Sequence, residues 1–180
     1  MNKSNLTPPR QSADVRQASD LLEDAFLRYQ GELLGTMYYL VGNREDARDA
    51  VQEAFVKCWR HVDQVPDVEN LKAWIFRIAL NTGRDLRKAA WRRKRQALPG
   101  DETMLAEKSL MPHDAVVRDE QLSRVRGAVA ELRPEEKEVF LLRQNGEMTY
   151  DQIAEAIGIP TGTVKTRMRL ALAKLRAAVA

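Results

Sequence analysis

Apolar residues recur at intervals of three and four along most of the chain, the spacing of helices that bury one face. The first series follows Ser19, a predicted N-cap, and stops at Gly42. A second helix is predicted over residues 44–61, and a third begins after Asn70, another predicted N-cap. No segment alternates apolar and polar residues as a half-buried strand does, so the pattern predicts an all-α fold.

The helical periodicity lapses over residues 97–117, which contain two prolines, one glycine and a net charge of −3. This composition is typical of a flexible acidic linker. Residues 1–18 begin with a run rich in Asn, Ser, Thr, Pro and Gln and are predicted to be a disordered lead-in. The remainder divides into two small helical domains, over residues 19–96 and 118–180.

The second domain contains the spacing of a helix-turn-helix. Thr149 and Gln152 match a capping box, Gly158 suits the left-handed residue that ends a helix, and Thr161 is the predicted cap of the next helix. From residue 159 to the end there are five lysine or arginine residues and no aspartate or glutamate. An ordinary helical hairpin with a solvated basic face is one interpretation, and a helix that enters the DNA major groove is the other, favoured because it explains both spacing and charge.

The exposed face of this last helix supplies the predicted DNA contacts. Lys165, Thr166 and Arg169 are placed for base edges. Arg167, Lys174 and Arg176 are placed for phosphates, which position a protein without reading sequence. The residues predicted to bind duplex DNA are Thr161, Thr163, Lys165, Thr166, Arg167 and Arg169.

Polar residues gather on one face of the second predicted helix, namely Asp46, Asp49, Gln52 and Glu53. Such a face can be a solvated surface, a metal site or a docking surface. No histidine or further carboxylate is positioned to complete a metal coordination shell, and the single cysteine and two histidines lack zinc-ligand spacing. We therefore predict no metal and no cofactor.

The third predicted helix is strongly basic. Residues 70–96 contain nine bases and one acid, a net charge of +8 in a chain whose total is +3. Trp74, Phe76 and Trp91 lie among these bases, and Trp74 is expected in the core because it shares a stripe with Ile78. Lysine and arginine side chains interleaved with aromatic rings are typical of a surface that binds single-stranded or melted DNA.

Two parts of the chain resemble conserved regions of the sigma-70 family, most closely its extracytoplasmic-function (ECF) group. Residues 42–59 and 73–81 are similar to region 2, and residues 158–167 to region 4. The resemblance implies a sigma factor that binds the beta and beta-prime subunits of core RNA polymerase and directs it to promoter DNA. Region 2 would melt and read the −10 element, and region 4 would read the −35 element.

The resemblance also implies roles for individual residues. The polymerase-binding residues would be Asp46, Asp49, Gln52 and Glu53, and the −10 contacts would be Arg77, Asn81, Arg84, Arg87 and Lys88. Two residues depart from the family pattern. Arg48 stands where an acid is usual, and Gly83 interrupts the third helix at a cost of about 1 kcal/mol relative to alanine, so local bending is expected there.

Such a protein would be a non-enzymatic, cytoplasmic monomer, with an anti-sigma factor as a further partner. No membrane insertion is expected, because no apolar run approaches the roughly 18 residues that a membrane helix needs. Two other classes stay open on the residues alone. One is a conventional repressor or activator that uses only the helix-turn-helix, and the other is a metal-dependent nuclease that uses the acidic face.

Overall fold

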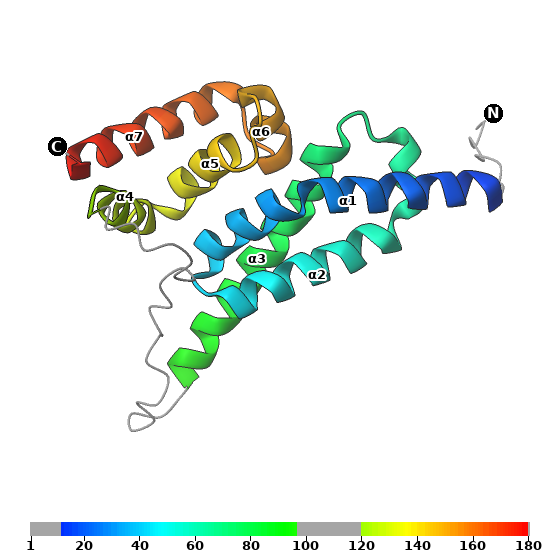
Figure 1. Ribbon diagram of the computed structural model, residues 1–180, viewed down its shortest axis with the longest axis horizontal. Helices are drawn as coiled ribbons and strands as arrows, with labels where there is room; N and C mark the ends of the chain where they lie inside the picture. The colour runs from blue at the N-terminus through cyan, green and yellow to red at the C-terminus, as the bar shows by residue number, and fades with distance from the viewer. Residues whose placement is uncertain (1–11, 97–119, 180) are drawn as a thin grey trace, which may run out of the picture.

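The computed structural model describes residues 12–96 and 120–179, and within them every regular element is a helix (Figure 1). The predicted all-α fold is therefore confirmed, while the predicted linker and residues 1–11 lie outside the described residues. The elements are α1 (Ser12–Val41), α2 (Arg44–Arg60), the 3₁₀ helix η1 (Val62–Asp67), α3 (Leu71–Gln96), α4 (Glu120–Ala130), α5 (Pro134–Gln144), α6 (Tyr150–Ile157) and α7 (Thr161–Val179).

Helices α1, α2 and α3, with η1, form an N-terminal block in which each long helix packs against the other two. The start of α1 differs from the prediction. The helix already begins at Ser12, and the Ser19 hydroxyl donates to the carbonyl of Val15 at 2.9 Å instead of capping the helix. Residues 12–18 are polar enough to suggest disorder, but Ala18 is buried in the core, so tertiary packing extends the helix.

The caps of α2 and α3 agree with the sequence. Gly42 adopts a φ of +94° after α1, and the Asn43 side chain accepts the backbone N–H of Asp46 at 2.8 Å. The Asn70 side chain accepts the N–H of Ala73 at 3.1 Å, which confirms the predicted cap of α3. Residues 62–67, which lie between the second and third predicted helices, form η1.

Helices α4 to α7 form a C-terminal block that contains the predicted helix-turn-helix. Both hydrogen bonds of the capping box between Thr149 and Gln152 are present, and Gly158 ends α6 with a φ of +76°. Thr161 was wrongly assigned as a cap. Its hydroxyl donates to the Asp151 carboxylate at 2.9 Å, while the Pro160 carbonyl accepts the first backbone hydrogen bonds of α7.

The two blocks pack directly on each other. Helices α5 and α6 lie against α1 and α3, so that one cluster of buried apolar residues draws on both blocks (Figure 1). Members of this cluster include Met37 and Phe76 from the N-terminal block, and Leu142, Met148 and Ile153 from the C-terminal block. The domains predicted from the sequence are therefore in contact as well as joined through the chain.

Gly83 marks the close approach of α3 to α1. A Cβ at this position would lie 3.1 Å from the sulfur of Met37, which is tighter than an ordinary van der Waals contact. Helix α3 runs without interruption through the glycine from residue 71 to residue 96. Glycine at this position lowers helix propensity, but it allows α1 and α3 to cross more closely than a residue with a Cβ would.

Candidate polymerase and nucleic-acid interfaces

The acidic face of α2 is largely open to solvent. Asp49, Gln52 and Glu53 are exposed, and Glu53 forms an ion pair with Lys57 one turn later, at 2.9 Å. Asp46 is only half-exposed because it belongs to the helix start. Its carboxylate accepts from the Asn43 side-chain amide at 2.6 Å, while its own N–H donates back to Asn43. Three of the four predicted polymerase-binding side chains are thus exposed to solvent, and Asp46 stabilises the N-terminal end of α2.

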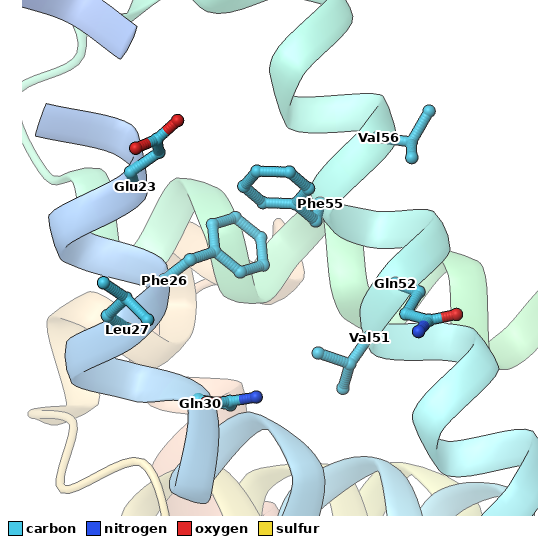
Figure 2. Close-up of a pocket in the computed structure, with 8 residues that line it drawn as sticks. All are labelled: Glu23, Phe26, Leu27, Gln30, Val51, Gln52, Phe55 and Val56. Carbon is cyan, nitrogen blue, oxygen red and sulfur yellow. The ribbon is translucent and has the colours of Figure 1, made fainter. Parts of the chain in front are cut away.

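An apolar groove of about 540 Å³ runs between α1 and α2 beside this acidic face (Figure 2). The phenyl rings of Phe26 and Phe55 point towards each other across it, edge to face, with centroids 4.9 Å apart. Gln52 belongs both to the groove and to the acidic face. The residues that line the groove are Glu23, Phe26, Leu27, Gln30, Val51, Gln52, Phe55 and Val56.

Several large apolar side chains at and next to the rim of the groove are exposed to solvent. Leu27 is 74% exposed and Val56 44%, and Trp59, which lines an adjoining hollow with Phe55 and Val56, is 39% exposed. Contiguous exposed apolar groups of this kind mark interaction surfaces. These exposed residues were not predicted from the sequence. A signal was present, because α2 carries a second row of apolar residues beside the row that includes the buried Ala54 and Cys58.

No group of three or more metal-ligating side chains comes together in the described parts of the chain. The thiol of Cys58 is fully buried, and this burial raises its pKa to about 12. Because the thiolate is the reactive form, the side chain acts as a small core residue. None of the described helices combines the length and apolar character that a membrane crossing requires.

The predicted −10 contacts lie along one side of α3, but they are not equally available. Arg77, Asn81 and Lys88 are exposed, whereas Arg84 and Arg87 are half-buried. The Arg84 guanidinium donates to the Asn81 side-chain oxygen at 3.1 Å. This bond fixes the orientation of two predicted DNA-binding side chains relative to each other.

Arg84 is also paired across the two blocks. Its Nε and a terminal nitrogen donate to the two carboxylate oxygens of Glu138 in α5, at 2.8 and 2.5 Å. The hydrogen bonds to Glu138 are the main cause that raises the pKa of Arg84. A residue predicted to bind DNA is therefore occupied by a carboxylate of the C-terminal block.

Of the three aromatic residues on the basic helix, only one is exposed. Trp74 and Phe76 are buried, which confirms the expected core position of Trp74. Trp91 is 59% exposed, and the Arg95 guanidinium lies 4.6 Å from its ring centre. Stacking on unpaired bases is thus open to Trp91 alone among these three.

Helix α7 has the predicted division into a buried and an exposed face. Its inward residues are Val164, Met168, Ala171 and Leu175, each less than 10% exposed. The outward residues Lys165, Thr166 and Arg169 are exposed, and the other predicted DNA contacts, Thr161, Thr163 and Arg167, are half-exposed. The phosphate role predicted for Lys174 conflicts with its pairing, because its ammonium donates to both carboxylate oxygens of Glu136, at 2.9 and 2.6 Å.

Comparisons with known proteins agree with this arrangement. Residues 25–93 match the family Sigma-70 region 2, and residues 122–175 match Sigma-70, region 4. The chain is 28% identical to the ECF RNA polymerase sigma factor SigW of Bacillus subtilis over 173 residues, 90% of this chain and 92% of the relative. It is 32% identical to the RNA polymerase sigma factor CnrH of Cupriavidus metallidurans over 140 residues, 73% and 72% of the two chains.

A solved structure has the same fold. The sigma factor RpoE from Bartonella quintana, in complex with the anti-sigma factor NepR, superposes with a TM-score of 0.71 over 89% of this chain and 97% of that one, at 23% identity. The chain belongs to the ECF group of the sigma-70 family. It is a promoter-specific transcription initiation factor, and proteins of this class are not enzymes.

Proposed function

We propose that the N-terminal block binds core RNA polymerase through α2. The observation that carries this proposal is the exposed acidic face, with Asp49, Gln52 and Glu53, directly beside an open apolar groove. The C-terminal block packs on α1 and α3 and leaves α2 free (Figure 1). A basic and apolar helical segment of the beta or beta-prime subunit would match both halves of this surface, and Asp46 would act by holding the start of α2.

The two blocks would divide promoter recognition between them. Residues 19–96, extended by the first turns of α1, would form the region 2 domain and residues 118–180 the region 4 domain. Along α3, the side chains of Arg77, Asn81 and Lys88, together with Arg84 and Arg87, would bind the melted −10 strand. On α7, Lys165, Thr166 and Arg169 would reach base edges of the −35 duplex, with Thr161, Thr163 and Arg167 beside them.

The proposed setting is the cytoplasm, where the protein would act as a monomer on polymerase and promoter DNA. An anti-sigma factor would be a further partner. This part rests on the relatives, because the RpoE structure holds its sigma factor together with the anti-sigma factor NepR. The open groove on α1 and α2 is a surface on which a partner helix could compete with polymerase.

Charge reversal on α2 tests the polymerase interface. The variant Asp49→Lys/Glu53→Lys changes two exposed side chains, so its folding is expected to be intact, with each change altering stability by at most about 0.5 kcal/mol. It should lose retention on immobilised core polymerase and lose promoter-dependent run-off transcripts from a genomic fragment library. The wild type should show both.

The matched control is Asp20→Lys/Glu131→Lys. It reverses two exposed acids away from α2, one on α1 and one in the turn after α4, and makes the same change in net charge. It should bind polymerase as the wild type does. Equal retention of the two variants would contradict the assignment of α2, and an absence of any promoter-dependent transcript from the wild type would contradict the function as a whole.

A further inference from the structure

A series of polar contacts connects the acidic face of α2 to the interior of the N-terminal block. The Lys57 ammonium on α2 forms an ion pair with Oε1 of Glu53 at 2.9 Å, and it also donates to the Thr82 hydroxyl on α3 at 3.1 Å. The Thr82 hydroxyl in turn donates to the carbonyl of Ile78, one turn earlier in α3, at 2.9 Å. A side chain of the proposed polymerase interface is therefore connected through Lys57 to a residue of the neighbouring helix.

The Thr82 side chain provides Lys57 with a fixed acceptor. A hydroxyl has one proton and two lone pairs, and the proton of Thr82 is used in the bond to Ile78. The hydroxyl can therefore offer only a lone pair towards α2, which an ammonium group satisfies. Thr82 is 1% exposed, so its oxygen is held beneath the surface and cannot itself touch a macromolecular partner.

Lys57 transfers this fixed position to the Glu53 carboxylate. Lysine and glutamate side chains have many rotamers, and an exposed ion pair between two such side chains is weak by itself. Here the Lys57 side chain is 34% exposed, against 50% for Glu53, and its ammonium is also bound to the buried oxygen of Thr82. The carboxylate is therefore held through one of its oxygens, and its second oxygen can accept from a partner.

We propose that Lys57 and Thr82 are positioning residues for polymerase binding, which hold the Glu53 carboxylate in the orientation that a basic group of the polymerase requires. The inference rests on the proposed polymerase interface of α2. Thr82 acts from beneath the surface and only through Lys57. The physical basis is preorganisation, because a side chain that is ordered before association loses less rotamer freedom when the complex forms.

A different role for Lys57 leads to a different result. If Lys57 only screens the acidic face, loss of its bond to Thr82 should not weaken polymerase binding, because the charges of the face are unchanged. If Lys57 positions Glu53, loss of the same bond should weaken binding. Thr82→Val distinguishes the two roles, since it removes the acceptor of the Lys57 hydrogen bond and alters neither a charge nor any side chain of α2.

The experiment measures the affinity of the full chain, labelled with fluorescein at its N-terminal amine, for core RNA polymerase by anisotropy titration. Thr82→Val should raise the dissociation constant about threefold, an effect in the range expected for one side chain that must be ordered on binding. Thr82→Ser keeps the hydroxyl and should bind as the wild type does. Wild-type affinity in Thr82→Val would overturn the proposal.

Thr36→Val is the matched control. Thr36, on α1, is also fully buried, and its hydroxyl oxygen has no hydrogen-bond partner within residues 12–96 and 120–179. The same replacement of a hydroxyl by a methyl group should leave the affinity for polymerase unchanged at this position. If both valine variants weaken binding equally, a general disturbance of the helical packing is the cause and the proposal is wrong.

A double-mutant cycle tests whether Thr82 acts through Glu53. Glu53→Gln removes the charge that is to be positioned, so the further change Thr82→Val should have little additional effect on the affinity of this variant for polymerase. Fully additive effects of the two changes would show that Thr82 acts by another route, and they would contradict the positioning role.

The outcomes separate this inference from the proposed function. Weaker binding in Glu53→Gln together with unchanged binding in Thr82→Val would overturn the positioning role and leave the α2 interface intact. Unchanged binding in Glu53→Gln would overturn the assignment of Glu53 to that interface, and with it the positioning role. Weaker binding in both single variants, with no further loss in the double variant and wild-type binding in Thr82→Ser, supports both proposals.

Discussion

Replacement of Ile153 by alanine should destabilise the whole described structure rather than the C-terminal block alone. Ile153 is fully buried in α6, the helix of the C-terminal block that packs against α3, and it belongs to the apolar cluster shared by both blocks. If the blocks share one core, the chain unfolds as one cooperative unit. A cavity in α6 then lowers the stability of α1, α2 and α3 as well.

The magnitude follows from the atoms removed. The substitution deletes roughly three carbon atoms at about 0.8 kcal/mol each, and the cavity left behind brings the expected loss to about 2–5 kcal/mol. For a chain of this size each kcal/mol lowers the melting temperature by about 2–4 °C. A loss of about 3 kcal/mol therefore predicts a decrease of about 6–12 °C in a single transition.

The assay is thermal unfolding followed by calorimetry and by circular dichroism. Leu80→Ala, which empties a fully buried site on α3 in the N-terminal block, is the comparison. Both variants should shift the same single transition. Two separate transitions, of which Ile153→Ala moves one and Leu80→Ala the other, would refute a shared core.

Two further predictions concern single positions. Gly146→Ala should lower stability by about 1–3 kcal/mol in the same melting experiment, because the added Cβ would lie 2.7 Å from the carbonyl oxygen of Leu142; an unchanged melting temperature would contradict this. Cys58 should resist alkylation at neutral pH until the protein unfolds, since burial holds its pKa near 12, and fast labelling of the native protein would disprove it. Because the raised pKa favours the protonated thiol in the folded state, Cys58 contributes to the free energy of unfolding below its ordinary pKa of 9.0. This contribution to stability is lost as the pH rises towards 12.

Local signals in the sequence predicted the helix ends well, because a cap depends on residues within one turn. The predicted cap at Asn70 and the capping box at Thr149 were confirmed, and Asn43, which was not predicted as a cap, caps α2 in the same local way. Two assignments of the same kind were wrong. Ser19 lies inside α1 because Ala18 is buried in the core, and the Thr161 hydroxyl turns to Asp151, ten residues away in the sequence.

The sequence by itself determined the helical periodicity, the helix-turn-helix and the basic character of α3, all of which depend on residues close together in the chain. It could not determine which charged side chains are free. Glu138 and Arg84 are 54 residues apart, and Glu136 and Lys174 are 38 apart. Periodicity carries no information about such pairs, because they form only when packing of the apolar faces brings distant helices together. Only the tertiary structure therefore decided that a predicted DNA-binding arginine is held by the second block, and that an open apolar groove borders the acidic face of α2.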